Sequence, residues 1–288
     1  MSKKVKIIKE LSIKYDVNWL CHIFELPRST YYAGLHRQPS KRSVKNQEIK
    51  GKITDIYEDS KKRYGCIKIK HALEKYNIYV SQNRVLRLMR QLGIRSVICK
   101  KYRKRSREID KTDRPNLLNR RFYAEKPNQI WLSDITYIKT IRNGWTYLAS
   151  VLDMCTRKVV GYSYSKNMTS DLTIEALNKA CKNQGYPQNV LLHSDQGSQY
   201  TAQPYIDTAN HFNMNLSYSA KACPFDNAPM ESFNSILKKE EVYISSYVDF
   251  DSAAPKLFDF IEGFYNRNRI HSSIDFMSPV DFELLFIK

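Results

Sequence analysis

The stretch QIWLSDITYIKT, residues 129–140, decides the fold class of this chain. Isoleucine, threonine and aromatic residues dominate it, and residues of these types favour β-strands. Two more strand-like runs follow, GWTYLASVLDM at 144–154 and RKVVGYSYS at 157–165. Asn143 and Gly144 lie between the first two runs and are typical of a tight hairpin turn. We therefore predict three antiparallel strands that begin a sheet.

Helical and strand-like segments alternate after these three runs. A helix is expected at 170–185, a strand at 189–194, a helix at 198–212 and a strand at 215–220, with a long helical region from Asn227. Three antiparallel strands followed by alternating helices and strands describe an α/β domain. The prediction is a mixed five-stranded sheet with flanking helices, the element order of a ribonuclease H-like core.

An all-α region is predicted before this domain. The segments NQEIKGKITDIYED (46–59), YGCIKIKHALEKY (64–76) and SQNRVLRLMRQLG (81–93) have helical patterns. Ser81 is a candidate N-cap of the third segment, and Gly93 is a helix stop. Two helices joined by a short turn are the architecture of helix-turn-helix DNA binding.

Polar and basic side chains of the last two of these segments are candidate DNA contacts. Apolar residues recur at three- and four-residue spacing in the last segment, so its arginines lie on other faces. The candidate contacts are Lys68, Asn83, Arg84, Arg87 and Arg90. The alternative is a solvated basic face on an ordinary surface helix.

Four regions are expected along the chain. Residues 1–45 hold short helical patterns and a basic linker, and Ser29 is a plausible N-cap of the last of these helices. Residues 46–98 form the helix-turn-helix domain, 99–125 a second basic linker, and 126–288 the α/β domain with C-terminal helices. The sequence suggests no function for the first region.

Positive charge is concentrated in the first half of the chain. The formal net charge of the 288 residues is +18. Residues 1–130 hold 33 Lys and Arg against 12 Asp and Glu, whereas residues 131–288 hold 14 against 17. Such clustering favours a module that binds a polyanion, and the alternative is that excess lysine only maintains solubility.

Cysteine spacing and hydropathy limit the class of protein further. The six cysteines stand apart, without the pairing of a zinc knuckle or a redox motif. No segment resembles a signal peptide, and no apolar run approaches 18 residues. We expect a cytoplasmic protein with reduced thiols that works on or near DNA, associated with a bacterial-type nucleoid and not with a membrane.

Three carboxylates have positions that suggest chemistry. Asp134 lies mid-strand, and alternation places it on the same face as Leu132 and Thr136. Asp195 follows the strand at 189–194, and Glu231 lies at the start of a helix. A buried carboxylate is costly unless it is paired or binds a cation. We predict that the three converge at one edge of the sheet.

Convergence would create a site for hard cations. Mg²⁺ prefers oxygen ligands, and two such ions can assist phosphoryl displacement. We expect two Mg²⁺ or Mn²⁺ ions. Each carboxylate also has a structural interpretation: Asp195 as a turn former, Glu231 as a helix-dipole partner and Asp134 as half of an ion pair.

Spacing and motifs together resemble a known group. Asp195 and Glu231 are separated by 35 residues, within HSDQGSQY and ESFNSILKKE. The segments RYGCIKIKHAL, NRVLRLMRQLGI, QIWLSDITYI and FYNRNRIHSSIDFMSPVDFE add to the match. The chain resembles the DDE transposase and retroviral integrase superfamily, and is most similar to OrfB-type insertion-sequence transposases, over roughly residues 45–285.

The resemblance implies roles for individual residues. Asp134, Asp195 and Glu231 would be the metal-binding catalytic triad. Lys238, seven residues after Glu231, would contact DNA near the cut. Gly197, Tyr200 and Asn227 match motif positions that support the site, with Gly197 allowing close approach of the backbone to phosphate. Arg267 and His271 fall in the C-terminal signature, where a DNA role and a helix surface with a capping histidine remain open.

The resemblance also implies an activity. A transposase would cleave phosphodiesters at the ends of an insertion sequence and transfer the freed strand to target DNA. Its partners would be double-stranded DNA with terminal inverted repeats, further copies of the chain, and an upstream-frame helix-turn-helix product, separate or fused. The alternatives are a catalytically silent DNA-binding regulator and a ribonuclease H-like nuclease that only hydrolyses.

Overall fold

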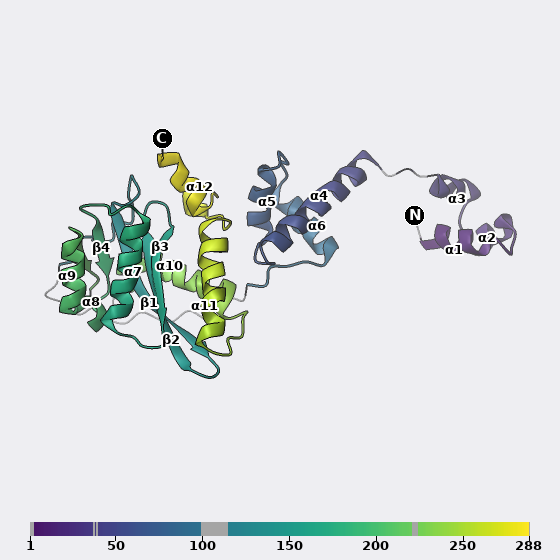
Figure 1. Cartoon of the computed structure of the whole chain (residues 1–288). Coiled ribbons are helices and arrows are strands. Elements are labelled where there is room, and N and C mark those ends of the chain that lie inside the picture. The colour runs from purple at the N-terminus through teal and green to yellow at the C-terminus, as the bar shows by residue number, and fades with distance from the viewer. Residues whose placement is uncertain (1–2, 37, 39, 99–114, 221–223, 288) are drawn as a thin grey trace.

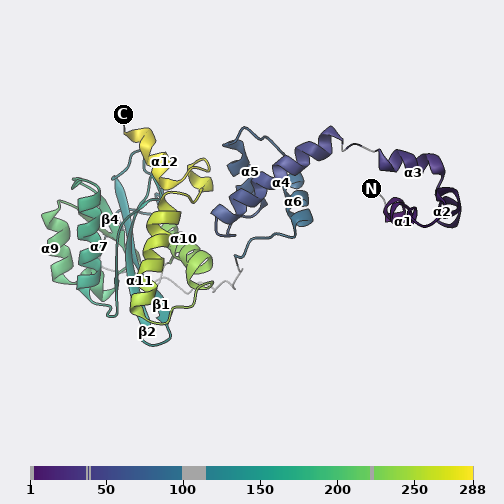
Figure 2. The same ribbon diagram turned by 45° about the vertical axis from the view of Figure 1, so that its right-hand side comes forward.

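The computed structural model describes residues 3–36, 38, 40–98, 115–220 and 224–287 of the chain. Three parts follow one another from the N-terminus, as Figure 1 shows: a small helical unit, a second helical unit and an α/β domain. The turned view in Figure 2 keeps the α/β domain at the opposite end from the N-terminal unit. This arrangement agrees with an all-α region that precedes the predicted α/β domain.

The sheet has the predicted number of strands and the predicted mixture of parallel and antiparallel pairing. Its strands are β1 (Ile130–Thr140), β2 (Gly144–Asp153), β3 (Val159–Ser165), β4 (Leu191–Ser194) and β5 (Asn215–Tyr218). Their order across the sheet is β3-β2-β1-β4-β5. β1, β2 and β3 pair antiparallel, whereas β4 is parallel to both β1 and β5. The mixed five-stranded sheet of a ribonuclease H-like core is confirmed.

One face of the sheet is covered by α7 (Ser170–Asn183) and α9 (Gln203–His211), which share a buried apolar cluster with the strands. Gly161 of β3 permits close contact with α7, because an added Cβ would lie 2.4 Å from the backbone nitrogen of Ala180. The helix predicted at 198–212 is broken: α8 and α9 are separated at Ala202, whose backbone is extended.

The other face is covered by α10 (Ala228–Leu237) and α11 (Phe250–Phe258), which share a second cluster with the strands. Both helices continue without a break into π-helical turns, at Lys238–Val242 after α10 and at Asp259–Asn266 after α11. The remaining elements are α8 (Ser198–Thr201), α12 (Pro279–Glu283) and 3-10 turns at Pro224–Asn227, Ser272–Ile274 and Leu284–Phe286.

The helix-turn-helix domain consists of α4 (Lys41–Asp59), α5 (Cys66–Glu74) and α6 (Gln82–Leu92). Ser81 caps α6 as predicted, since its hydroxyl accepts a hydrogen bond from the backbone of Arg84, and Gly93 ends it in the left-handed conformation. The first helix begins earlier than position 46, because the hydroxyl of Ser40 caps it.

The N-terminal unit contains α1 (Lys3–Leu11), α2 (Val17–Ile23) and α3 (Arg28–Leu35). The expectation that Ser29 caps α3 is wrong. Pro27 occupies the N-cap position, and no side chain caps the helix there. The three helices bury their own small apolar cluster, built from Val5, Ile8, Leu20, Cys21 and Tyr31.

The described part of the second predicted linker packs on the α/β domain. The backbone N–H groups of Leu117 and Leu118 donate to the hydroxyl of Ser217 in β5, over 2.9 and 3.1 Å. Leu118 is buried. Residues 99–114, the first part of this predicted linker, lie outside the described residues. Within the part that is described, no helix combines the length and apolarity needed to cross a membrane.

Candidate active site

Asp134 and Asp195 lie on neighbouring parallel strands. Leu132 of β1 pairs with His193 of β4. Continuing this register by two residues brings Asp195, directly after the end of β4, beside Asp134. Asp134 is half-buried and Asp195 is exposed. The parallel pairing explains why two carboxylates that are far apart in sequence lie at one edge of the sheet.

Glu231 reaches the same edge from the first turn of α10. A hollow of about 630 Å³, which we call the β1–α10 hollow, separates this helix from β1. Its polar lining includes Asp134, Thr136, Glu231, Asn234 and Lys238. Leu132 and Thr136 are buried on this side of the sheet, so the predicted alternation along β1 is confirmed.

The acidic groups influence one another electrostatically. Burial, followed by the charges of Asp195 and Glu231, raises the pKa of Asp134 to about 7. The N–H of Ile135 and the ammonium of Lys238 act in the opposite direction. Burial also raises the pKa of Glu231. A site that disfavours its own negative charge in this way would be stabilised by a bound cation.

Asn234 is part of this site, although its role was not predicted from the sequence. Its side-chain Nδ2 donates to Oδ2 of Asp134 over 2.8 Å, while Ile135 N donates to Oδ1 of the same carboxylate over 2.8 Å. Oδ1 of Asn234 is buried and has no partner among the described residues. The available signal was spacing, because Asn234 lies three residues after Glu231 and so on the same face of the helix.

Tyr200 and Asn227 support the residue next to Asp134. The hydroxyl of Tyr200 shares a hydrogen bond of 3.1 Å with Oγ of Ser133, and Nδ2 of Asn227 donates to the carbonyl of Ser133 over 3.2 Å. Both side chains are buried. These bonds connect α8 and the start of α10 to the middle of β1. They therefore hold the backbone next to Asp134 in place.

Gly197 is placed directly against Asp195. Its N–H donates to Oδ1 of Asp195 over 3.0 Å, and an added Cβ would lie 3.0 Å from that oxygen. The absence of a side chain therefore leaves the carboxylate room to move. Close approach of the backbone to a phosphate, the role expected for this glycine, stays a prediction.

The donor set fits a hard divalent cation. All three predicted ligands offer carboxylate oxygens, which Mg²⁺ prefers, and the buried Oδ1 of Asn234 is a further oxygen without a partner. Within the described ranges, no three histidine, cysteine or acidic side chains form a ready metal cluster. Asp134 and Glu231 line one hollow, and Asp195 adjoins it on the neighbouring strand.

Lys238 lies where its spacing from Glu231 predicted. The α-helix from Glu231 is unbroken up to Leu237, and Lys238 begins the π-helical turn that continues it. Lys238 lines the β1–α10 hollow, and its charge lowers the pKa of Asp134. No carboxylate of the described residues lies within salt-bridge distance of its ammonium group.

The predicted DNA contacts divide into two groups. Asn83, Arg87 and Arg90 are exposed and recur at four- and three-residue spacing, so they form one stripe along α6. Arg84 does not join the stripe, because its guanidinium donates to Oδ1 of Asn46 in α4 over 2.7 Å.

Lys68 does not lie on this stripe either. Its ammonium is 3.9 Å from Oε1 of Glu240 and lies over the ring of Tyr64. Burial, followed by the charge of Arg269, lowers the pKa of Lys68 to about 7. The position of Lys68 beside Glu240 therefore indicates a structural role inside the protein and not a contact with a phosphate.

A buried ion cluster connects the helix-turn-helix domain to the end of α10. Arg63 donates from Nη2 to Oε2 of Glu241 and from Nε to the carbonyl of Glu240, over 2.8 and 2.7 Å. The guanidinium of Arg269 forms two hydrogen bonds with the carboxylate of Glu240, of 2.9 and 2.8 Å. The buried ion cluster therefore comprises Arg63, Lys68, Glu240, Glu241 and Arg269.

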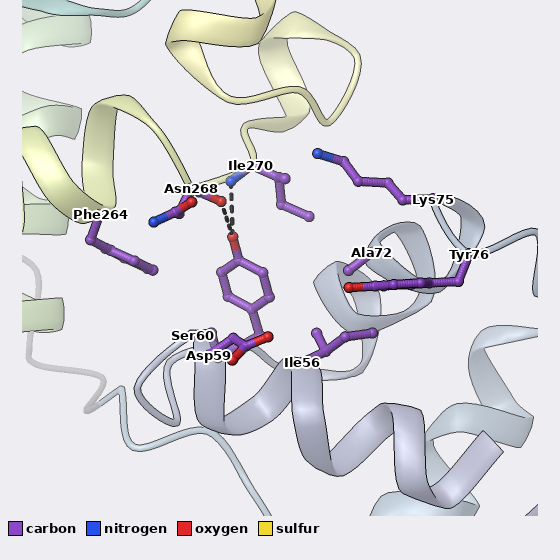
Figure 3. Close-up of a pocket in the computed structure, with 10 residues that line it drawn as sticks. Ile56, Asp59, Ser60, Ala72, Lys75, Tyr76, Phe264, Asn268 and Ile270 are labelled. Carbon is purple, nitrogen blue, oxygen red and sulfur yellow. Dashed lines mark hydrogen bonds between the residues drawn. The ribbon is translucent and has the colours of Figure 1, made fainter. Parts of the chain in front are cut away.

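Tyr64 makes a second connection between the two domains. Its hydroxyl donates to the carbonyl of Asn268 over 2.8 Å and accepts from the N–H of Ile270 over 3.0 Å (Figure 3). A pocket of about 350 Å³ lies at this contact, with Ile56 and Tyr76 on one side and Phe264 on the other. The C-terminal signature is thus the docking site of the helix-turn-helix domain.

Arg267 and His271 differ in their surroundings. Arg267 is exposed at the end of the second π-helical turn, so both of its interpretations stay open. His271 is buried, with its ring edge-on to Tyr265, and lies 3.1 Å from Nη1 of Arg269. The structure therefore places His271 inside the domain contact.

Both the α/β domain and the helix-turn-helix domain of this chain match known protein families. Models of the integrase core domain match residues 124–224 and 231–284, and a model of an HTH-like domain matches residues 45–102. The chain is 37% identical to the transposase for insertion sequence element IS904 of Lactococcus lactis subsp. lactis (strain IL1403), over 86% of this chain and 98% of that protein. It is 33% identical to transposase InsF for insertion sequence IS3A of Escherichia coli (strain K12), over 97% and 98%.

These matches establish the family. The chain belongs to the insertion-sequence transposases of the DDE transposase and integrase superfamily. It is a DNA transposase, and hence a polynucleotidyl transferase. Among solved structures, the HTLV-2 integrase catalytic core domain in complex with magnesium is similar at 19% identity and a TM-score of 0.44, over 56% of this chain and 99% of that one.

Proposed function

We propose that Asp134, Asp195 and Glu231 are the catalytic carboxylates of this transposase and hold two Mg²⁺ or Mn²⁺ ions. One observation carries the proposal: Asp195, directly after β4, and Glu231 of α10 lie close enough to Asp134 of β1 that, in addition to burial, their charges raise its pKa. Structural carboxylates are normally paired with cationic side chains or neutralised, whereas a functional metal site concentrates negative charge.

The bound ions would supply a polarised water and stabilise charge during in-line displacement at phosphorus. The side chains of the protein position the ions and the DNA. β1 and β4 hold Asp134 and Asp195, α10 presents Glu231 and Asn234, and Lys238 presents a cation to the phosphate next to the scissile bond. Water would first cleave one phosphodiester at the element end and free a 3′-hydroxyl.

The freed hydroxyl would then attack a phosphodiester of the target DNA. One phosphorus–oxygen bond forms as another breaks, so strand joining needs no external energy source and no covalent bond between protein and DNA. Duplex DNA would be held by the stripe of Asn83, Arg87 and Arg90 on α6. We further propose that copies of the chain assemble on the two element ends, with or without an upstream-frame helix-turn-helix product.

Two other activities would leave different products. A nuclease that only hydrolyses would nick the element end without joining it, and a silent regulator would bind without cutting. The test is to incubate the full chain with Mg²⁺, a labelled duplex carrying the element end, and a target plasmid. We expect end-specific nicks followed by labelled joined product. Nicks alone would support the nuclease, and binding alone the regulator.

A further inference from the structure

The N-terminal unit contains a second pair of helices with helix-turn-helix spacing. α2 and α3 are separated by the four residues Phe24–Pro27, whereas α5 and α6 are separated by the seven residues Lys75–Ser81. Helix-turn-helix motifs use turns of three to four residues, so the N-terminal pair meets this criterion more closely. The shorter turn makes the unit a candidate for the same kind of binding.

α3 is fixed rigidly on the rest of this unit. Its inward residues are Tyr31, Gly34 and Leu35, at the three- and four-residue spacing of one helix face. Gly34 allows the closest approach, since an added Cβ would lie 3.0 Å from Cγ2 of Val5 in α1. A helix held in this way can present its other face without losing conformational freedom on binding.

The outward face of α3 suits a polyanion. Its exposed residues are Arg28, Ser29, Thr30, Tyr32 and Ala33. Residues 26–47 contain five Lys and Arg but no Asp or Glu. The exposed face of α3 itself therefore carries hydroxyl, guanidinium and phenol groups and no carboxylate, and its nearest acidic neighbour in the sequence is Glu25 in the turn before it. Groups of these types can contact phosphates and base edges.

We propose that α3 is a second DNA-reading helix, which enters the major groove of duplex DNA beside the site bound by α6. The proposal rests on the proposed DNA-end binding and deepens it, because it predicts a bipartite recognition sequence. The chain between Leu35 and Lys41 spans at most about 20 Å. The two binding sites on DNA must therefore lie within about two helical turns of each other.

The test is selection of binding sites by the full chain from duplexes with a randomised central segment of about 40 base pairs. The wild type should select two short conserved blocks at a fixed separation. Arg28→Ala combined with Tyr32→Ala should lose conservation at one block, keep the other, and bind the selected duplex on the order of tenfold more weakly. Ala33→Glu should do the same, because it places a carboxylate on the DNA-facing surface.

Lys6→Ala is the matched control. Lys6 is exposed on the side of α1 opposite Val5 and Ile8, and its substitution removes the same charge as Arg28→Ala. It should leave both blocks intact. A single block with wild-type protein, or two blocks unchanged in the α3 variants, would overturn the proposal. So would a uniform loss of affinity equal to that of Lys6→Ala. Since the assay reads binding alone, it can fail while strand joining stands.

Discussion

Asn234 donates a hydrogen bond of 2.8 Å from its side-chain amide to Oδ2 of Asp134. Asn234 lies on α10 three residues after Glu231, so this bond joins the helix that carries one predicted ligand to the strand that carries another. An uncharged donor can orient a carboxylate without neutralising it. The hydrogen bond from Asn234 therefore holds α10, which carries Glu231, close to Asp134 without adding a positive charge to the site.

Asn234→Ala should slow Mg²⁺-dependent cleavage by roughly 10- to 100-fold, the range that corresponds to loss of a hydrogen bond to a charged group. The Mg²⁺ concentration for half-maximal rate should rise, because Asp134 loses its orientation. The control is Asn210→Ala, at an exposed position of α9. Full activity of the Asn234 variant at low Mg²⁺ would show that the bond has no functional role.

Lys238→Ala should weaken productive binding of the element end by about 1–3 kcal/mol, while the Mg²⁺ dependence of cleavage changes little. The reason is that Lys238 lines the β1–α10 hollow but, as an ammonium group, cannot ligate a metal. Titrating the cleavage rate against DNA and against Mg²⁺ separates the two effects. If the dependence on DNA does not change, Lys238 serves only to balance charge at Asp134.

Arg63→Met should destabilise the full chain by about 3–5 kcal/mol, because it leaves Glu241 buried without its cation. The two side chains are only 5% and 10% exposed. Urea unfolding followed by circular dichroism gives the free energy of unfolding. Combining Arg63→Met with Glu241→Gln should recover part of the loss.

The control for this pair is Arg142→Met, which removes an exposed contact to Asp249 and should cost about 0–1 kcal/mol. Equal losses in the two arginine variants would contradict the conclusion that the Arg63–Glu241 ion pair is buried and stabilises the folded chain.

His271 should make the chain less stable in mild acid. Burial lowers the pKa of His271 to about 2, and the charge of Arg269 contributes in the same direction. Below the usual histidine pKa near 6.5, the unfolded chain binds a proton that the folded chain does not. The free energy of unfolding therefore decreases as the pH falls below about 6.5, by up to about 1.4 kcal/mol per pH unit.

The variant His271→Gln should show a smaller fall in Tm between pH 7 and pH 5 than the wild type, even if its Tm at pH 7 is lower. His211→Gln, at an exposed position, should keep the wild-type pH dependence. An identical fall in Tm for wild type and His271→Gln would mean that His271 does not titrate on unfolding.

Local sequence signals predicted the strands and most helices because they depend on neighbouring residues. Period-2 alternation around Asp134 correctly gave its face of the sheet, and Ser81 correctly gave the start of α6. The failures were also local: Pro27 supplied the start of α3 in place of Ser29. Proline at a helix start fixes the backbone angle without a side-chain cap, and a search for capping hydroxyls does not detect it.

Long-range partners could not be predicted in the same way. Arg84 and Lys68 were expected on a DNA-facing surface, but Asn46 binds the first and Glu240 lies beside the second. A basic residue on a helix has the same sequence signal whether its partner is a phosphate or a distant carboxylate. The buried ion cluster was missed for the same reason, since Arg63 and Glu241 are separated by 178 positions.

The central claim is that the three carboxylates catalyse strand cleavage and joining. The most direct measurement compares wild type with Asp195→Asn for Mg²⁺-dependent cleavage, joining and affinity on one labelled element-end duplex. Asp207→Asn, exposed on α9, is the matched control. We predict that Asp195→Asn abolishes both reactions while its affinity for the duplex stays within about threefold of wild type, since no basic contact is removed. Cleavage by Asp195→Asn near the wild-type rate would contradict the claim.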